Sequence, residues 1–231
     1  MRLSIVVPCY NVEKYCRPVI EQILPQCTSL ILIDDGSTDQ THKILQEFQS
    51  KNKEKIHLIT FSENKGKGAA LLKGFQYALN QIPFDTLLTI DSDGQHLPSE
   101  IPKLTASVAK GADFVIGSRN FKHAPFIRRL PNQIISFLLH RLFPNAPKDT
   151  QSGYRAFNKA VIQKFEKEIY GNRYELEFRC LIIALRDNLK IEECPIKTIY
   201  HKKNISSHFS AVKDSALILN VFFKYWRSKR L

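Results

Sequence analysis

The sequence is poor in the residues that mark fibrous, disulfide-rich and membrane-spanning proteins. It has 9 glycines and 11 prolines among 231 residues, which excludes collagen-like repeats and linker-type chains. No run of about 18 apolar residues occurs, so no conventional transmembrane helix is predicted. The N-terminal apolar run ends at Pro8 and is too short for the core of a signal peptide. The five cysteines are odd in number and include no Cys-x-x-Cys pair, so we expect buried thiols in a reducing compartment.

Acidic side chains are outnumbered by basic ones, 22 to 34, which gives a formal net charge of +12. Such a surplus indicates an anionic partner: nucleic acid, an acidic membrane surface or a phosphorylated substrate. Because no nucleic-acid-binding motif accompanies the charge, we expect no nucleic acid partner. Hydrophobic residues make up 43% of the chain, enough for the core of one large α/β domain.

The first half of the chain alternates short β-branched runs with stretches of helical spacing. Near-continuous apolar strands separated by helices are typical of parallel strands buried on both faces. The pattern predicts a β-α-β-α-β-α-β-α-β order over about the first 120 residues. The expected strands cover residues 3–7, 30–33, 56–61, 86–90 and 114–116.

The second half of the chain has a more mixed pattern. We expect helices at residues 134–143 and 175–186, one or two strands within 189–200, and a helix from about residue 211 onward. Residues 149–157 are typical of a polar turn followed by a short extended piece. Since no Gly/Ser/Pro-rich linker separates the halves, we predict one domain with an elaborated C-terminal part.

Two acidic clusters follow the second and fourth predicted strands. In open α/β sheets, ligands bind outside the carboxyl ends of the strands, so these clusters indicate a site. The alternative is that Asp, Gly, Ser and Thr only form turns and helix caps there. The clusters are Asp34-Asp35-Gly36-Ser37-Thr38-Asp39 and Asp91-Ser92-Asp93-Gly94-Gln95-His96.

The spacing of Asp91 and Asp93 would let both carboxylates approach one divalent cation. Mg²⁺ and Mn²⁺ prefer hard oxygen ligands and are often held by one or two carboxylates plus substrate phosphates. Without a cation, we expect repulsion between the two carboxylates to raise a pKa. The second cluster therefore predicts a metal site.

A glycine-rich segment, Asn64-Lys65-Gly66-Lys67-Gly68-Ala69-Ala70, follows the third strand and opens a helix. A helix N-terminus with small residues can bind an anion, and the two lysines add positive charge. The alternative is a glycine-assisted helix start with solvated lysines. The spacing matches neither a P-loop nor a dinucleotide-binding fingerprint.

Six segments, taken together, resemble the family 2 glycosyltransferases with the GT-A fold, and more narrowly their polyprenyl-phosphate sugar synthases of the dolichol-phosphate-mannose-synthase type. The resemblance covers residues 4 to about 160 and implies a Rossmann-like, mostly parallel sheet flanked by helices. On this basis residues 1–210 form the catalytic domain and residues 211–231 a terminal apolar and basic helix. The segments are Val6-Val7-Pro8-Cys9-Tyr10-Asn11, Asp34-Asp35-Gly36-Ser37-Thr38-Asp39, Asn64-Lys65-Gly66-Lys67-Gly68, Asp91-Ser92-Asp93-Gly94-Gln95, Gly117-Ser118-Arg119 and Asp149-Thr150-Gln151-Ser152-Gly153-Tyr154-Arg155.

The resemblance implies a nucleotide-sugar donor and a divalent metal. Asp91 would face the donor ribose or sugar, while Asp93 and Gln95 would hold Mg²⁺ or Mn²⁺ on the diphosphate. Asp35 and Asp39 would lie near the base or ribose. The remaining donor-binding residues implied are Pro8, Tyr10, Asn11, Glu13, Lys65, Gly68 and Ser92.

The reaction implied is an inverting, metal-dependent transfer of a hexose, from a donor of the GDP-mannose or UDP-glucose class, to a dolichyl or undecaprenyl phosphate. Arg119, with Arg128 or Arg129, would bind the acceptor phosphate, because arginine forks bidentately onto phosphate oxygens. The alternative acceptor is a hydroxyl of a glycan, lipid or protein, which requires a general base. Asp149 lies where such a base could stand, and it could equally be a turn residue that holds Ser152 and Arg155.

Two further expectations concern the C-terminal part. Lys202 and Ser206 lie where relatives have a basic, serine-containing flexible loop, so this segment is either a lid over the donor diphosphate or a solvated loop. The Gln-x-x-Arg-Trp motif of processive family members is missing, which disfavours polymer synthesis.

The C-terminal helix is apolar nearly all round from Ala216 and ends in basic residues. One interpretation places it in a membrane interface, with Trp226 at the boundary and the basic residues on anionic headgroups. The other packs it on the domain or in a homodimer interface. With a lipid-phosphate acceptor and no membrane span, we expect a cytoplasmic enzyme peripherally associated with the membrane face.

Overall fold

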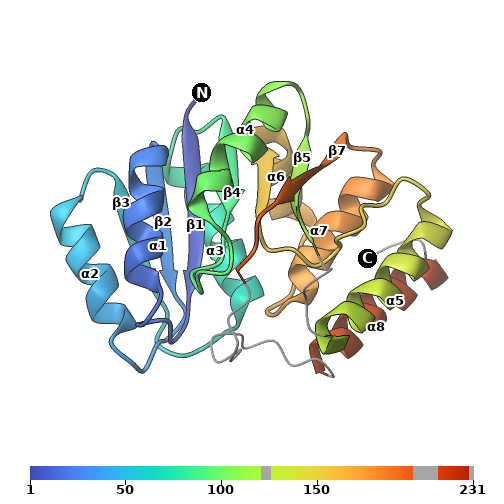
Figure 1. The fold of residues 1–231 in the computed structure, drawn as a ribbon, viewed down its shortest axis with the longest axis horizontal. Coiled ribbons are helices and arrows are strands. Elements are labelled where there is room, and N and C mark those ends of the chain that lie inside the picture. Colours follow the sequence, from blue (N-terminus) through green and yellow to red (C-terminus); the bar gives the residue numbers. More distant parts are fainter. Residues whose placement is uncertain (121–125, 200–212, 229–231) are drawn as a thin grey trace.

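A seven-stranded sheet runs through the middle of the computed structural model, which describes residues 1–120, 126–199 and 213–228 (Figure 1). The strand order is β3-β2-β1-β4-β6-β5-β7, and β6 runs antiparallel to its neighbours while the other pairs are parallel. The prediction of a mostly parallel sheet is confirmed. The strands are β1 (Leu3–Cys9), β2 (Ser29–Asp34), β3 (Ile56–Thr60), β4 (Thr86–Thr89), β5 (Phe114–Arg119), β6 (Arg155–Asn158) and β7 (Ile191–Ile196).

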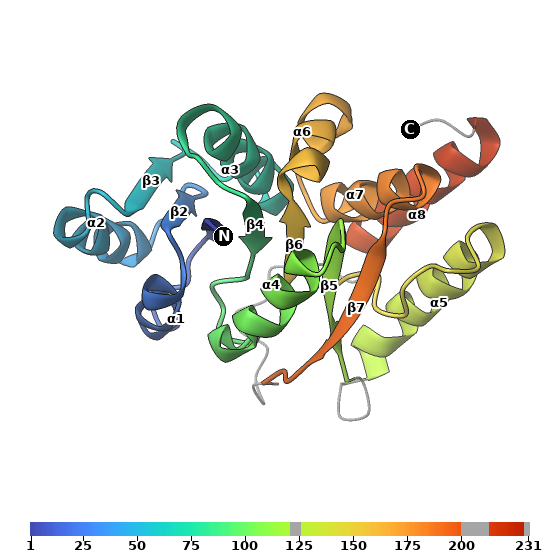
Figure 2. The ribbon, with the colours of Figure 1, turned by 90° about the horizontal axis from the view of Figure 1, so that it is seen from above.

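Helices cover both faces of the sheet, giving three layers (Figure 2). Helices α1, α2 and α4 pack into one apolar core, and α3, α5, α6, α7 and α8 pack into the other. The helices are α1 (Cys16–Ile23), α2 (Thr41–Lys51), α3 (Lys67–Gln81), α4 (Ile101–Ala109), α5 (Phe126–Leu142), α6 (Lys159–Glu168), α7 (Glu175–Arg186) and α8 (Lys213–Ser228), with short 3₁₀ turns at Leu24–Gln26 and Pro98–Glu100.

The buried strands feed both cores because successive side chains of a strand point to opposite faces. In β1, Ile5 and Val7 enter the core with α1, whereas Val6 enters the core with α3. Every residue of β1 is buried, which explains why its sequence is a continuous apolar run instead of an alternating one.

The last helix has an exposed apolar face as well as a buried one. Ile218, Val221, Phe222 and Tyr225 belong to the core shared with α7. On other faces of the same helix, three apolar side chains are exposed, namely Leu217, Phe223 and Trp226. The packing on the domain expected in one interpretation therefore occurs, and it leaves apolar surface uncovered.

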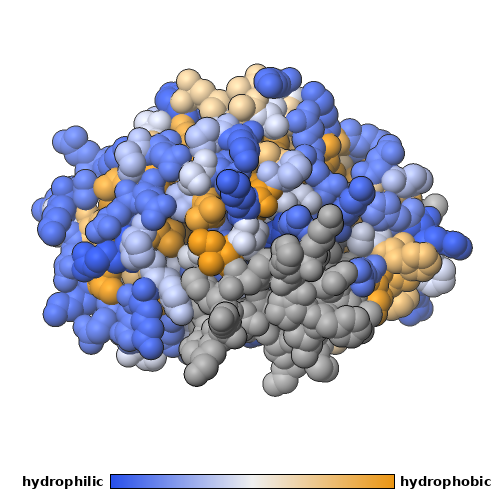
Figure 3. Space-filling model, viewed as in Figure 1, coloured by the Kyte–Doolittle hydropathy of each residue, from blue (hydrophilic) through white to orange (hydrophobic). Residues whose placement is uncertain are grey.

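Helix α5 has the same division between buried and exposed apolar side chains. Ile135 and Leu139 are buried, while Ile134 and Phe137 are exposed. Figure 3 shows hydrophobic colour on the side of the molecule where α5 lies in Figure 1. Within the described residues, no helix has both the length and the apolarity that crossing a membrane requires.

The second half differs from the expectations at the start of α5 and in one added helix, whereas the strand expected within residues 189–200 and the short extended piece are found. Helix α5 begins at Phe126, so Pro131 lies inside it instead of ahead of it. Strand β7 ends at Ile196, after which Thr198 forms only an isolated bridge to His96. The short extended piece becomes β6, which inserts between β4 and β5 and leads into α6, a helix that was not predicted.

Candidate functional site

The carboxyl ends of the parallel strands bring the predicted site residues to one edge of the sheet. The strand order reverses between β1 and β4, the position at which open α/β sheets bind ligands. A hydrogen bond of 2.7 Å from Ser92 Oγ to the carbonyl of Pro8 joins these two strand ends. The clusters after β1, β2 and β4, together with Arg119 at the end of β5, therefore lie at the same edge.

Asp91 is held by a lysine from helix α3. Lys67 Nζ lies 2.7 Å from Asp91 Oδ1 and 3.2 Å from Glu177 Oε2 on α7. Lys67 and Glu177 are nearly buried, and Asp91 is partly exposed. A Cβ at Gly153 would lie 2.5 Å from Lys67 Nζ and 2.7 Å from Asp91 Oδ2, so a larger residue there would displace this ion pair.

This lysine overturns two expectations about charge. Burial acts to raise the pKa of Asp91, but Lys67, together with His96 and Arg119, outweighs burial and the pKa is lowered. Burial by itself would lower the pKa of Lys67, but the carboxylates of Asp91 and Glu177 hold it above its usual value. The expected rise of a pKa from carboxylate repulsion is wrong for Asp91, and Lys67 is not a solvated lysine.

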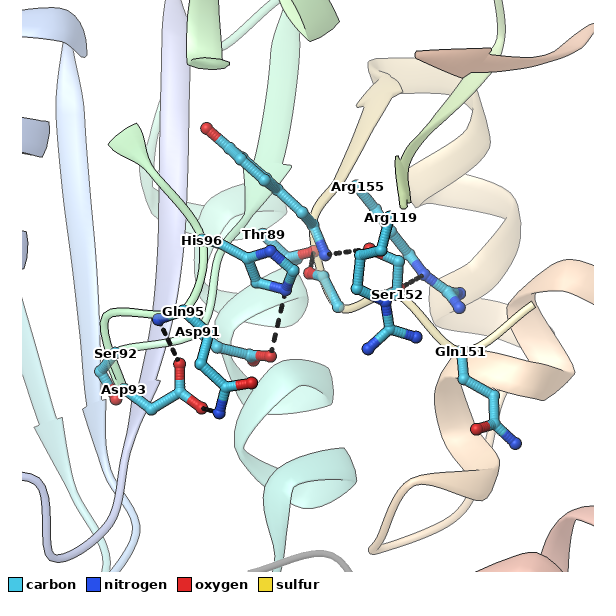
Figure 4. A network of polar contacts seen from close by, with 12 residues as sticks. Thr89, Asp91, Ser92, Asp93, Gln95, His96, Arg119, Gln151, Ser152 and Arg155 are labelled. Carbon is cyan, nitrogen blue, oxygen red and sulfur yellow. Dashed lines mark hydrogen bonds and ion pairs between the residues drawn. The ribbon is translucent and has the colours of Figure 1, made fainter. Parts of the chain in front are cut away.

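His96 lies beside Asp91 as a neutral, buried ring. Its Nε2 is 3.8 Å from Asp91 Oδ2, too far for a hydrogen bond. Burial lowers the pKa of His96 to about 4, so the imidazole carries no charge near neutral pH. Figure 4 shows the two side chains turned toward each other, with the pair formed by Asp93 and Gln95 beside them.

Asp93 and Gln95 are bonded within their own loop. The Gln95 backbone amide donates to Asp93 Oδ1 at 3.0 Å, and Gln95 Nε2 donates to Asp93 Oδ2 at 2.6 Å. Within the described part of the chain, no group of three or more His, Cys, Asp or Glu side chains is placed to hold a metal ion. A carboxylate and an amide oxygen are hard donors, and they fit a cation whose other ligands are substrate phosphates and water.

Arg119 and Asp149 form a second ion pair at the same edge. Arg119 Nε donates to Asp149 Oδ2 at 2.8 Å, and Arg119 Nη2 donates to Asp149 Oδ1 at 2.9 Å. Asp149 is almost completely buried, which alone would raise its pKa, but the charge of Arg119 and the hydrogen bonds from Arg119 and the Gln151 amide together outweigh burial and lower it. The turn interpretation named the wrong partners, since Arg155 donates instead to the carbonyls of Ser152, Thr150 and Glu177.

The first acidic cluster connects the loops around it by accepting hydrogen bonds from their backbone amides. Asp35 accepts hydrogen bonds from the backbone amides of Lys65 and Gly66, at 2.7 and 2.9 Å. Asp39 accepts from the backbone amides of Glu13 and Thr41, the latter at the start of α2. The turn and cap interpretation therefore accounts for these contacts of the cluster.

The loop after β1 is tied to the loop after β2. Asn11 Oδ1 accepts from the backbone amide of Thr38 at 2.8 Å, and Glu13 Oε2 accepts from the amide of Gln40 at 3.0 Å. Asn11 has a φ of +49°, a left-handed conformation that asparagine tolerates better than most residues. Tyr10 is half-buried at the start of this loop.

The glycines at the start of α3 admit another backbone segment. A Cβ at Gly66 would lie 2.3 Å from the carbonyl oxygen of Asn172, and one at Gly68 would lie 2.4 Å from that of Arg173. Ala69 N donates to the Asn172 carbonyl at 3.1 Å. Lys65 is exposed, with its ammonium over the Phe61 ring.

The structure describes the positions of some, but not all, of the residues predicted to bind the acceptor or form the lid. Arg128 and Arg129 lie near the start of α5, and the role expected of them stays a prediction. Lys202 and Ser206 lie outside the described residues, as does the predicted lid.

Sequence reasoning missed Glu177 altogether. The available signal was an acidic residue in the largely apolar α7, where every residue from Leu176 to Leu185, including Arg179, is buried. A carboxylate buried in such a helix has to be paired, and Lys67 is the partner found.

Comparisons with known proteins bear on the family of the chain. The model of the family "Glycosyl transferase family 2" matches residues 4–168. The chain is 33% identical over 216 residues to the UDP-N-acetylglucosamine–dolichyl-phosphate N-acetylglucosaminyltransferase of Methanococcus voltae, covering 86% of each chain. It is 26% identical over 203 residues to the polyprenol monophosphomannose synthase of Mycolicibacterium smegmatis, covering 84% of this chain and 76% of that one.

A solved structure shares the fold. Glucosyl-3-phosphoglycerate synthase from Mycobacterium tuberculosis, in complex with UDP, superimposes with a TM-score of 0.74 at 20% identity, over 96% of this chain and 79% of that chain. The family match covers most of the sequence and contains both acidic clusters. The chain is therefore a glycosyltransferase with the GT-A fold, and it belongs to glycosyl transferase family 2.

Proposed function

We propose that this enzyme transfers a hexose, with inversion, from a nucleotide-diphosphate sugar to a polyprenyl phosphate. The observation that carries the proposal is the pair of carboxylates, Asp91 and Asp93, at the carboxyl end of β4 beside the reversal of strand order. The names of the Methanococcus and Mycolicibacterium relatives specify dolichyl phosphate and polyprenol as their acceptors, which supports a lipid phosphate here.

The donor nucleotide is proposed to lie across the ends of β1, β2 and β4. The hydrogen bonds between the loops after β1 and β2 support this, because they hold Tyr10, Asn11 and Glu13 in a defined position before the donor arrives. Asp91 would face the donor ribose or sugar, with Pro8, Asp35, Asp39, Lys65, Gly68 and Ser92 around the nucleotide. These residues belong to the proposed catalytic domain, residues 1–210.

A divalent cation, Mg²⁺ or Mn²⁺, is proposed to bind with the donor at Asp93 and Gln95. When bound, it would neutralise the charge that develops on the departing diphosphate. The oxygen donors of these two residues support a cation that takes its other ligands from phosphates. The synthase from Mycobacterium tuberculosis that shares the fold was solved with Mn²⁺, UDP and phosphoglyceric acid.

The acceptor phosphate is proposed to approach from the side of Arg119 and the start of α5, where Arg128 and Arg129 lie. Asp149 orients the Arg119 guanidinium through two hydrogen bonds. The same contacts argue against a hydroxyl acceptor served by Asp149, because a buried carboxylate with a lowered pKa and an arginine on both oxygens is a poor general base.

The proposed reaction is a single displacement. An anionic oxygen of the polyprenyl phosphate attacks C1 of the donor sugar, and the bond from C1 to the diphosphate oxygen breaks. The electron pair leaves with the nucleoside diphosphate, and the configuration at C1 inverts. The nucleophile is already ionised, so the residues of the enzyme have to position it and stabilise the leaving group.

Peripheral binding to a membrane is part of the proposal. The exposed apolar side chains of α5 and α8, together with Lys224 and Arg227, would rest on an anionic membrane surface. The alternative is that the same exposed apolar side chains form a homodimer interface.

The test is a transfer assay with purified protein. Labelled UDP-N-acetylglucosamine, GDP-mannose and UDP-glucose are each incubated with dolichyl or undecaprenyl phosphate and Mg²⁺ or Mn²⁺, and the lipid phase is analysed. We expect an acid-labile lipid-linked sugar from at least one donor. Transfer only to glycan, lipid or protein hydroxyls would overturn the proposal in favour of a hydroxyl acceptor.

A further inference from the structure

Lys67 is a buried cation shared by two carboxylates from different elements. Asp91 follows β4, and Glu177 lies in the first turn of α7. Their oxygens are 2.7 and 3.2 Å from Lys67 Nζ, and the exposed fractions of the three side chains are 14% for Lys67, 26% for Asp91 and 7% for Glu177. Charges this close and this poorly hydrated interact strongly, so the position of each depends on the other two.

Only one oxygen of Asp91 is used by this lysine. Oδ1 receives the Lys67 ammonium, while Oδ2 faces the neutral His96 ring at 3.8 Å. Among the described residues no hydrogen-bond donor reaches Oδ2, and the side chain is partly open to solvent. Oδ2 is therefore available to accept a hydrogen bond from a sugar or ribose hydroxyl.

Glu177 meets Lys67 through one of its two carboxylate oxygens, Oε2. Its Oε1 is buried, and within the described residues it has no hydrogen-bond partner. Such an oxygen destabilises a fold, and an apolar or amide side chain would avoid the cost. Glu177 also lies beyond residues 4–168, the region that the family model matches.

The backbone around Glu177 is held firmly. Arg155 donates to its carbonyl, and the same region packs through Asn172 and Arg173 against the glycines that precede and follow Lys67. The carboxylate of Glu177 is thus presented to Lys67 by fixed backbone on both sides.

We propose that Glu177 is a positioning residue for glycosyl transfer, which acts through Lys67 on Asp91. The Glu177 carboxylate attracts the Lys67 ammonium and so keeps Lys67 between the two carboxylates. Asp91 Oδ2 then stays turned toward the donor. The inference rests on the proposed function, in which Asp91 contacts the donor sugar or ribose. Without the charge of Glu177, Lys67 moves wholly onto Asp91 and weakens it as an acceptor.

The primary variant is Glu177→Gln, which has the same shape and lacks the charge. We expect kcat/KM for the donor to fall about tenfold to a hundredfold, the range found when residues that orient a functional side chain are changed. Glu177→Asp retains the charge and is expected to recover part of the loss. Glu192→Gln, a matched change in an exposed pair with Lys190, is expected to leave kcat/KM unchanged.

Binding separates positioning from a loss of stability. Calorimetry is done with UDP-N-acetylglucosamine and UDP, and with GDP-mannose and GDP, at a temperature where thermal melts show every variant folded. In Glu177→Gln we expect weaker binding of the nucleotide sugar than in wild type; a loss confined to the nucleotide sugar indicates that Asp91 contacts the sugar, and an equal loss for the nucleoside diphosphate indicates that it contacts the ribose. Wild-type binding of both ligands would overturn the proposal.

A double-mutant cycle with Lys67→Met tests whether the effect passes through the lysine. If Glu177 acts through Lys67, Glu177→Gln has little further effect in the Lys67→Met background. A full, additive loss there would overturn the inference. The proposed function fails separately, if the wild-type enzyme neither binds nor turns over any nucleotide sugar.

Discussion

At the scale of single residues, the buried charges of the site are paired with groups from other parts of the chain. Asp91 is paired with Lys67, Asp149 with Arg119, and Arg155 with the backbone carbonyl of Glu177. Asp93 differs, because the hydrogen bonds found for its carboxylate come from Gln95 in its own loop. The two carboxylates of the second acidic cluster therefore have different surroundings, which suits them to different tasks.

The first prediction concerns Asp93. In Asp93→Ala we expect a loss of turnover of at least about a hundredfold, because the charge on the departing diphosphate loses its stabilisation. We expect a melting temperature close to wild type, since Asp93 is only half-buried and lies in the loop that follows β4. A transfer assay and thermal melts measure the two effects.

Asp85→Ala is the control, because Asp85 is an exposed carboxylate paired with Arg2. With metal present, Asp85→Ala should turn over substrate as fast as wild type. When EDTA is added, both proteins should lose activity. Wild-type turnover that persists in EDTA would refute the metal assignment.

The second prediction concerns the pair of Arg119 and Asp149. Arg119→Met leaves the buried Asp149 carboxylate without its cation, so we expect the free energy of unfolding to fall by about 3–5 kcal/mol. Asp149→Asn should cost less, because the Arg119 side chain is partly exposed and can be hydrated. Urea unfolding of the two variants at neutral pH measures the asymmetry.

The same pair predicts a pH dependence. The folded-state pKa of Asp149 lies below that of the unfolded chain, so its contribution to stability is complete above about pH 4 and is lost as pH falls through the folded-state pKa. The difference in unfolding free energy between wild type and Asp149→Asn should therefore shrink below about pH 4. A constant difference across this range would contradict the assignment.

At the scale of secondary-structure elements, the start of α3 is the element most constrained by its neighbours. Its glycines accept the backbone of residues 172 and 173, and Asp35 receives the amides just before it. This packing carries Lys67 to Asp91 and Glu177. The glycines are therefore needed because the backbone of residues 172 and 173 packs directly against them, in addition to any contribution to nucleotide binding.

The third prediction compares two glycines with nearly the same positive φ. Gly66 and Gly111 have φ values of +97° and +96°, but a Cβ on Gly66 meets the Asn172 carbonyl whereas nothing lies within 4 Å of one on Gly111. Gly111→Ala should cost about 1–2 kcal/mol of unfolding free energy for the strained φ. Gly66→Ala should cost about 1–3 kcal/mol more, because backbone has to move.

Chemical denaturation gives both free energies. Turnover separates the two variants further, since displacement of residues 172 and 173 should disturb Lys67. Equal costs and equal turnover for the two variants would show that the contact with Asn172 is unimportant.

At the scale of the whole molecule, the net charge of +12 and the exposed apolar side chains of α5 and α8 both bear on which surface the protein binds. Phe137 is 64% exposed and Trp226 is 57% exposed. Lys224 and Arg227 are exposed on α8 between and beside its apolar residues. An acidic membrane complements both properties, whereas a neutral protein surface complements only one.

The fourth prediction is binding to anionic vesicles. We expect the protein to co-sediment with vesicles that contain phosphatidylglycerol, and to bind more weakly as salt is raised, because salt screens the charges. Phe223→Ala combined with Trp226→Ala should weaken binding at least about tenfold through lost apolar burial.

Tyr170→Ala is the matched control, since Tyr170 is an exposed aromatic residue outside α5 and α8. It should bind vesicles like wild type. If the protein ignores vesicles and the Phe223 and Trp226 changes instead convert a dimer to a monomer, the face is a homodimer interface.

Much of the fold follows from local sequence. Apolar runs with turn residues between them predicted the five parallel strands of the first half, since a strand buried on both faces needs little more than apolar residues of sufficient length. The acidic clusters were placed at the strand ends because Asp, Gly and Ser interrupt apolar strands there. The order of the motifs was enough to identify the family.

The tertiary structure decided what depends on contacts between distant residues. Periodicity could not show that β6 inserts antiparallel between β4 and β5, nor which face of α8 is buried, because that helix is apolar nearly all round. Nor could it pair Lys67 with both Asp91 and Glu177, or Arg119 with Asp149. Ion pairs of this kind form between side chains that folding brings together. Local sequence can show that a charge lies among apolar residues, but it cannot show which distant residue pairs with it.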